Sequence, residues 1–229
     1  MKKLHLMLFV FLLSTLIIIP ASGIAAQSPM IIDHTCTDIR QIPESAILQA
    51  KNSLHIAYAH TSHGSQLISG MGSNGTQLDT FMTNNGATPG LYLWHDGPQT
   101  GALDLDDYFV SGDLGNPDRV TWAQRTRDYL DNPNNADVNV IIWSWCGQVS
   151  GSESDINTYL NLMNQLEIDY PNVMFVYMTG HLDGSGETGN VNVRNNQIRD
   201  FCIANNKVLY DFADIESYGP DGLVNFMEL

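Results

Sequence analysis

The chain has 229 residues and a formal net charge of −15 at pH 7, because 25 acidic residues stand against 10 basic ones. Such an excess of negative charge repels phosphate backbones and anionic membrane surfaces, so nucleic acid is excluded as an expected partner. The length and the 43% of hydrophobic residues fit one α/β domain with a sizeable core.

The first 25 residues predict a targeting segment. Lys2 and Lys3 precede an apolar run over residues 4–20, and small residues follow it, with Gly23 and Ala25 suited to a cleavage site. The apolar run is short for a membrane span. We therefore expect a cleaved signal peptide at 1–25, a single domain at 26–229, secretion to an extracellular or periplasmic location, and no membrane attachment after cleavage.

Helical and strand patterns alternate from residue 43 onward. Helices are expected over 43–51, 64–82 and 116–130, from Ser152 to about residue 166, and over 190–205; strands are expected over 54–59, 91–94, 138–143, 173–178 and 207–211. Residues 97–116 show little periodicity and predict a long surface loop. Strands separated by helices indicate parallel pairing, so the expected fold class is α/β, a three-layer sandwich with a central parallel sheet of about five strands.

The segment 138–143 is the most continuously apolar of the expected strands. Strands that are half exposed alternate between apolar and polar residues, whereas strands buried on both faces do not. This segment is therefore expected to lie in the middle of the sheet. His55, at the start of the strand 54–59, is interpreted as a structural residue.

Polar and ionisable residues follow every expected strand, at the sheet edge where ligands of parallel α/β proteins gather. Ser62 lies at the turn between a buried strand and a helix, where α/β hydrolases place their nucleophile. Such a turn exposes the serine hydroxyl, and the backbone N–H groups at the start of the helix can stabilise an oxyanion. The alternative is a polar strand-to-helix loop without a catalytic role. Ser65 is the rival serine, and its expected role is to cap or line the helix.

Three segments carry a resemblance to a known family: His60-Thr61-Ser62-His63-Gly64, Trp145-Cys146-Gly147-Gln148 and Thr179-Gly180-His181-Leu182-Asp183. They resemble a group of secreted bacterial proteins within the SGNH hydrolase superfamily, and the resemblance spans about residues 33–221. It implies an SGNH or flavodoxin-like fold, with Ser62 as the nucleophile and Gly97 and Gln148 as oxyanion donors. The sequence departs from the superfamily at Thr61 and His60, which replace the usual Asp and Gly, and at Gln148, which replaces the usual Asn.

The same resemblance leaves the general base open. The superfamily carries an Asp and a His near its C-terminus, but this chain has no histidine after His181. The resemblance thus implies either a C-terminally truncated domain or one that lacks this base. His181 is the candidate catalytic replacement; its alternative role is to hydrogen-bond its own loop or to line the substrate pocket. Further residues expected to line that pocket are His60, His63, His95, Trp145 and Asp183.

The histidines and aspartates after the strands also raise the question of zinc, for which imidazole and carboxylate are suitable ligands. Their spacing matches no zinc motif, so we expect neither a metal nor another cofactor. The three cysteines, Cys36, Cys146 and Cys202, are an odd number for a secreted protein. A free thiol, an intermolecular bridge and a missing partner all remain open, as does a bridge between Cys36 and Cys202.

The function expected from these observations is that of a secreted serine esterase. Its substrate would be a small-molecule or carbohydrate ester, with acetyl groups of an extracellular polysaccharide as the leading class. The alternative is a non-catalytic carbohydrate-binding or surface-interaction protein on the same fold.

Overall fold

The computed structural model describes residues 28–112, 115–116, 118–219 and 222–228, and the predicted signal peptide lies outside them. Its centre is a single parallel sheet of seven strands in the order β1-β7-β6-β5-β2-β4-β3. The strands are β1 (Met30–Ile32), β2 (His55–His60), β3 (Trp94–His95), β4 (Leu103–Asp107), β5 (Val140–Ser144), β6 (Met174–Met178) and β7 (Val208–Tyr210). The predicted α/β class with a parallel sheet is confirmed, but the sheet has seven strands rather than five.

The two additional strands are β1 and β4. β1 has only three residues, too few for a periodic pattern. β4 lies inside the segment that was predicted to be a surface loop, and that prediction is wrong. Its Leu103 and Leu105 are buried while Asp104 and Asp106 are half-buried, which is the alternation of a strand. The glycines and aspartates around this segment hide the alternation.

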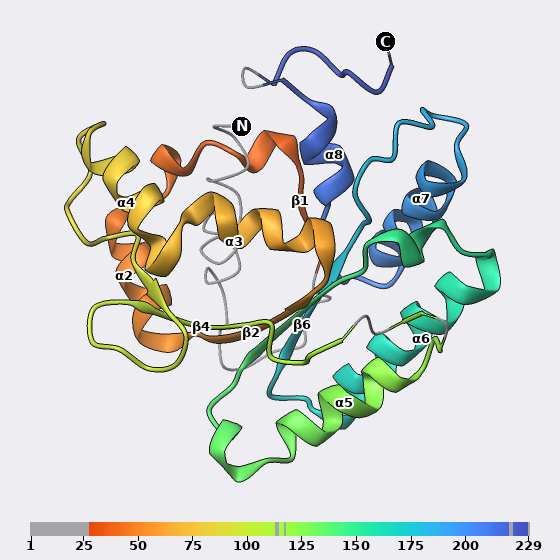
Figure 1. Cartoon of the computed structure of the whole chain (residues 1–229), viewed down its shortest axis with the longest axis horizontal. Coiled ribbons are helices and arrows are strands. Elements are labelled where there is room, and N and C mark those ends of the chain that lie inside the picture. Colours follow the sequence, from red (N-terminus) through yellow and green to blue (C-terminus); the bar gives the residue numbers. More distant parts are fainter. Residues whose placement is uncertain (1–27, 113–114, 117, 220–221, 229) are drawn as a thin grey trace.

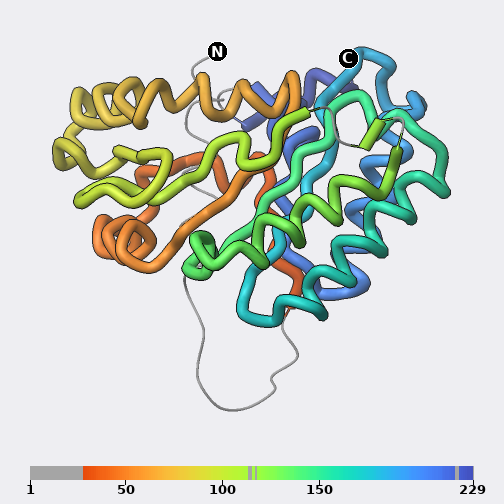
Figure 2. Tube along the Cα trace, turned by 60° about the horizontal axis from the view of Figure 1, so that its bottom comes forward, coloured from red at the N-terminus to blue at the C-terminus, as the bar shows by residue number. Residues whose placement is uncertain are grey.

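Helices cover both faces of the sheet (Figure 1). One face carries α2 (Glu44–Ser53), α3 (Ser65–Met71), α4 (Thr76–Thr83) and α8 (Phe212–Ser217), and the other carries α5 (Thr121–Leu130), α6 (Glu153–Asp169) and α7 (Asn190–Ala204). In Figure 2, the orange and yellow helices α2, α3 and α4 lie apart from the green, teal and lighter blue helices α5, α6 and α7. No helix of the described part of the chain is long and apolar enough to cross a membrane.

Local sequence signals explain where the helices begin and end. The expected helix over 64–82 is divided into α3 and α4, because Gly72 and Gly75 adopt φ angles of 79° and 75°, which end a right-handed helix. α6 begins at the predicted Ser152, whose side chain forms a capping box with Asp155. α5 starts at Thr121, later than predicted, where the Asp118 carboxylate accepts the backbone N–H groups of residues 120 and 121.

Two hydrophobic cores result from the alternation of side chains along the strands. Ile56 and Tyr58 of β2 face the core beneath α2, α3, α4 and α8, while Ala57 and Ala59 face the core beneath α5, α6 and α7. All five residues of β5 are buried, and β5 lies between β6 and β2. The predicted central, doubly covered position of this strand is confirmed.

The strand order creates a switch point beside β2. From β2 the chain proceeds to β3 and β4 on one side, and then crosses to β5, β6 and β7 on the other. The crossover connections that follow β2 and β5 therefore diverge and leave a crevice at the carboxyl ends of these two strands. In open parallel sheets, such a switch point is where ligands bind.

The cysteines are free thiols in this fold. Cys36 is partly exposed shortly after β1, whereas Cys202 is on α7 and is buried in the second core. The bridge between Cys36 and Cys202, which the sequence left open, is not formed.

His55 stands at the amino end of β2, within a cluster of carboxylates. Its Nε2 lies 3.2 Å from Oδ2 of Asp106 and 3.5 Å from Oδ1 of Asp104, and its Nδ1 lies 3.2 Å from Oδ2 of Asp137. Burial opposes the charged imidazolium, but the hydrogen bond to Asp106 and the surrounding negative charge outweigh it and raise the pKa of His55 to about 9. The interpretation of His55 as a structural residue agrees with these contacts.

This cluster predicts a pH dependence of stability. The pKa of His55 is higher in the folded state than in the unfolded chain. Its contribution to the free energy of unfolding is therefore complete below about pH 6.5 and is lost as the pH rises through about 9. The contribution amounts to at most about 3 kcal/mol. We expect the free energy of unfolding, measured in urea, to fall over this interval, and to fall less in His55→Gln. Parallel curves for the two proteins would contradict the prediction.

Candidate functional site

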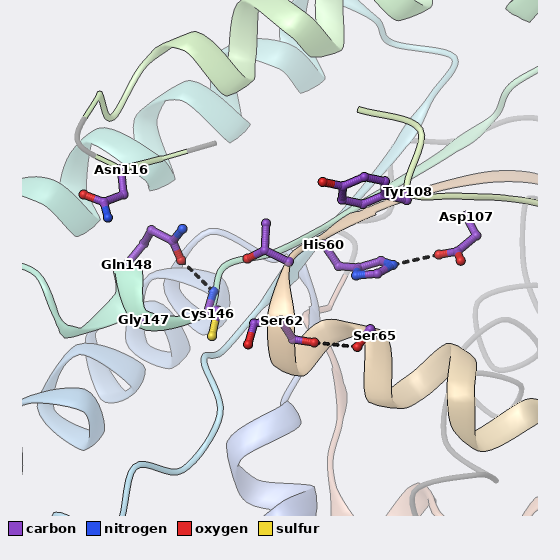
Figure 3. A pocket seen from close by; sticks show the side chains of 10 residues that line it. His60, Ser62, Ser65, Asp107, Tyr108, Asn116, Cys146, Gly147 and Gln148 are labelled. Atoms are coloured by element: carbon purple, nitrogen blue, oxygen red, sulfur yellow. Dashed lines mark hydrogen bonds and ion pairs between the residues drawn. The ribbon is translucent and has the colours of Figure 1, made fainter. Parts of the chain in front are cut away.

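A pocket of about 690 Å³ opens at the carboxyl ends of β2 and β5, at the switch point of the sheet (Figure 3). It contains the predicted nucleophile Ser62, the predicted oxyanion donor Gln148, and His60, which was predicted to line the substrate pocket. The residues that line it are His60, Thr61, Ser62, Ser65, Asp107, Tyr108, Asn116, Cys146, Gly147 and Gln148.

Ser62 occupies the sharp turn between β2 and α3. Its φ angle is 38°, in the left-handed region that residues with a side chain rarely adopt. The Ser65 hydroxyl donates to the carbonyl oxygen of Ser62 over 2.6 Å, which agrees with the capping role expected of Ser65. In Figure 3, Ser62 lies between Cys146 and Ser65 at the pocket wall. A strained backbone at a serine is a feature of nucleophile turns.

The turn at Ser62 is supported from below by tight packing at Gly64. The buried Tyr58 hydroxyl donates to the carbonyl oxygen of Gly64 over 3.0 Å. A Cβ atom at residue 64 would lie 2.5 Å from the Cβ of His60 and 2.9 Å from the Tyr58 oxygen. Only glycine therefore fits there without a shift of its neighbours.

His60 forms the closest histidine–carboxylate pair of the pocket. Its Nε2 lies 2.7 Å from Oδ1 of Asp107, the last residue of β4. Figure 3 shows the ring directed at Asp107, away from Gln148. The sequence analysis missed Asp107 and its neighbour Tyr108, because both lie in the segment that was predicted to be a loop. The alternating leucines and aspartates of β4 are the signal that reveals them.

A second group of ionisable side chains lies on the β5 side of Ser62. His63 Nδ1 is 3.2 Å from the Cys146 sulfur, and the rings of His63 and His181 stack with their centroids 3.6 Å apart. Neither His63, which was predicted to line the pocket, nor His181 is part of its wall; His63 contacts Cys146, which is, and His181 stacks on His63. Burial and the neighbouring His181 lower the pKa of His63.

The loop that carries His181 is anchored at three points. The N–H of Gly180 donates to the buried side chain of Asn195 over 2.8 Å, and a Cβ at Gly180 would lie 2.9 Å from Val149. The N–H of Leu182 donates to the carboxylate of Glu216 over 2.9 Å. Burial raises the pKa of Glu216. These contacts hold His181 against the segment that follows β5.

Gln148 presents an amide group to the pocket. Its side chain is 5% exposed, and its Oε1 accepts the N–H of Cys146 over 2.9 Å. Because the oxygen is engaged with the backbone, the NH₂ group is the donor end of this side chain. The backbone of Gly147 lines the pocket beside it. Gln148 and Gly147 thus line the pocket next to Cys146.

Gly97 and His95 do not line this pocket. The N–H of Gly97 donates to the Asp106 carboxylate, and His95 Nδ1 donates to the carbonyl oxygen of Gly97 over 3.0 Å. The reason is the insertion of β4 between β2 and β3, which separates the loop after β3 from Ser62. A sheet without β4 would have made these loops neighbours.

Trp145 and Asp183 are also absent from the pocket wall. The Trp145 side chain is 3% exposed and packs against Trp122 and Tyr159 in the second core. Asp183 accepts hydrogen bonds from the backbone and hydroxyl of Ser185, which lower its pKa. Asp183 thus stabilises the turn that follows His181.

Comparison of the chain with models of protein families, with curated proteins and with solved structures found no match.

Proposed function

We propose that this protein is a secreted serine hydrolase of the SGNH type that cleaves acyl esters, with acetyl groups of extracellular polysaccharides as its substrate class. The observation that carries the proposal is Ser62. It has a strained backbone at a strand-to-helix turn, and it lines a pocket at the switch point of a parallel sheet. Secretion follows from the targeting segment that the sequence predicts.

In the proposed reaction, the Ser62 oxygen attacks the ester carbonyl and its proton passes to an imidazole. The tetrahedral oxyanion is stabilised by the Gln148 amide and by backbone N–H groups at the turn. Collapse of this intermediate releases the alcohol, which takes the proton from the imidazole. Water then attacks the acyl-enzyme, the same imidazole accepts the water proton, and the acid leaves as Ser62 is regenerated.

We assign the general base to His181, supported by the stacked His63. Ser62 lies on the Cys146 side of the pocket (Figure 3). His63, whose ring stacks on His181, contacts Cys146. His60 is the competitor, since it lines the pocket and pairs with Asp107. Its Nε2 is already engaged with that carboxylate, and its Nδ1 is buried. The assignment to His181 requires that its imidazole come within hydrogen-bond distance of the Ser62 hydroxyl.

Two observations favour the alternative, a non-catalytic carbohydrate-binding protein. Among the described residues, no hydrogen bond joins the Ser62 hydroxyl to an imidazole. The pocket also contains Tyr108, an aromatic side chain that is 43% exposed and suited to stacking on a sugar ring.

Hydrolysis of short-chain model esters and of an acetylated polysaccharide separates the two functions. A serine hydrolase is expected to release acid in the presence of a chelator and to be labelled by an organophosphonate probe on the peptide that contains Ser62. A binding protein is expected to retain the polysaccharide, to release no acid and to remain unlabelled. Labelling on the Ser65 peptide alone would refute Ser62 as the nucleophile.

A further inference from the structure

The cluster of His63, Cys146 and His181 differs from the other groups of ionisable side chains in the described residues. Its potential ligand atoms all lie within 4.8 Å of one another. Two other clusters, around His34 and His55, meet the same criterion, but each consists of a histidine already paired with a carboxylate. Here two imidazoles and a thiol meet, and neither imidazole forms an ion pair with a described carboxylate.

We propose that His63, Cys146 and His181 form a binding site for Zn²⁺. Imidazole nitrogen and thiolate sulfur are the ligands that zinc prefers, whereas magnesium and calcium select oxygen. Three protein ligands leave a fourth, open position in a tetrahedral site. Cys146 lines the cavity that Ser62 also lines, so the proposed metal site is adjacent to that cavity.

The distances in the cluster suit this ion. With Zn–N at about 2.0 Å and Zn–S at about 2.3 Å, a tetrahedral site separates nitrogen from sulfur by roughly 3.5 Å. His63 Nδ1 and the Cys146 sulfur are 3.2 Å apart, so a shift of a few tenths of an ångström admits the ion. The two imidazole rings are stacked at an angle of 15°, and they must turn apart for both lone pairs to reach the metal. All three side chains are only half-buried, which leaves room for this rotation.

His181 already has the hydrogen bond that zinc-binding histidines typically make. Its Nδ1 lies 2.6 Å from the carbonyl oxygen of Leu182, and a carbonyl can only accept, so Nδ1 carries the proton. The lone pair therefore resides on Nε2, the nitrogen available to a metal. The N–H of Leu182 is in turn bound by the Glu216 carboxylate, which fixes the orientation of this residue.

Binding has a defined proton balance. Zinc binds thiolate sulfur and the neutral form of imidazole, so coordination by the Cys146 sulfur releases the thiol proton to solvent. If the proposed function is correct, zinc also inhibits ester hydrolysis, because a lone pair of His181 that is donated to the metal cannot accept the proton of Ser62. This consequence rests on the proposed function, but the metal site itself does not.

Cobalt(II) tests the site directly, because it replaces zinc and gives an absorption spectrum. Titration of chelator-treated protein with CoCl₂ is expected to produce, at one equivalent, the visible bands of tetrahedral cobalt and a near-ultraviolet sulfur-to-cobalt charge-transfer band. ZnCl₂ is expected to abolish both by displacement. Absence of these bands in the wild-type protein would overturn the proposal.

Substitutions identify the ligands. Cys146→Ser is expected to lose the charge-transfer band, and His63→Gln and His181→Gln to weaken zinc binding by more than about 100-fold, which exceeds the loss typical of an outer hydrogen-bond partner. Cys36→Ser is the matched control and is expected to keep the full spectrum. A charge-transfer band that survives in Cys146→Ser and disappears in Cys36→Ser would overturn the assignment. Circular dichroism of each variant verifies that it folds.

The proposed metal site and the proposed esterase activity can be tested independently of each other. Ser62→Ala is expected to bind cobalt as the wild-type protein does, whatever its effect on ester hydrolysis. A cobalt spectrum, together with no ester hydrolysis by the chelator-treated, metal-free protein, would support the metal site and refute the enzyme. Ester hydrolysis without a cobalt spectrum would support the enzyme and refute the metal site.

Discussion

Replacement of Ser62 by alanine is expected to lower kcat for ester hydrolysis by about 10⁴-fold or more, as the loss of a catalytic serine does in other hydrolases. Alanine removes only the hydroxyl oxygen and adopts the φ of 38° with the same strain as serine, so the fold should persist. The measurement is kcat and KM for a short-chain acyl ester, in the presence of a chelator, together with the melting temperature.

Two further serine variants make this result specific. Ser65→Ala loses the hydrogen bond to the Ser62 carbonyl and is expected to reduce kcat much less than Ser62→Ala. Ser73→Ala, at an exposed position in the turn before α4, is the matched control and is expected to leave the kinetics unchanged. Loss of activity in Ser65→Ala with normal turnover in Ser62→Ala would identify the other serine as the nucleophile.

Replacement of His181 by glutamine is expected to lower kcat by about 10²- to 10⁴-fold, the range for removal of a general base. Glutamine retains a polar side chain at the site but cannot accept the serine proton. Because His181 is not among the residues that line the pocket, substrate binding should be affected less, so KM is expected to change little. A chelator in the assay keeps metal binding from contributing to the difference.

His60→Gln is the competing variant. If His181 is the base, this substitution removes the pairing with Asp107 at 2.7 Å and is expected to reduce kcat less than His181→Gln does. The opposite order, with a large loss in His60→Gln and almost none in His181→Gln, would transfer the base to the His60–Asp107 pair. In that case Asp107→Asn should reproduce most of the loss.

Much of the fold could be predicted because it depends on local patterns. The apolar run around β5 indicates a doubly covered strand, and the Ser152–Asp155 capping box marks the start of α6. The hydroxyls and imidazoles that follow β2 indicate a functional turn, and the structure finds Ser62 there in a strained conformation. β4 also has a local signal, but its leucines alternate with aspartates in a segment dominated by loop-forming residues.

The sequence by itself determined the alternation of strands and helices, the buried β5 and the turn at Ser62, since each follows from side-chain periodicity and backbone preferences over a few residues. The tertiary structure alone decided which turns meet. His60 contacts Asp107 across 47 residues of chain, and His63 contacts Cys146 across 83. Both contacts depend on the order of β5, β2 and β4 in the sheet, which the free energy of packing the two cores selects and which no local pattern encodes. The same order directs Gly97 to Asp106 and away from the pocket.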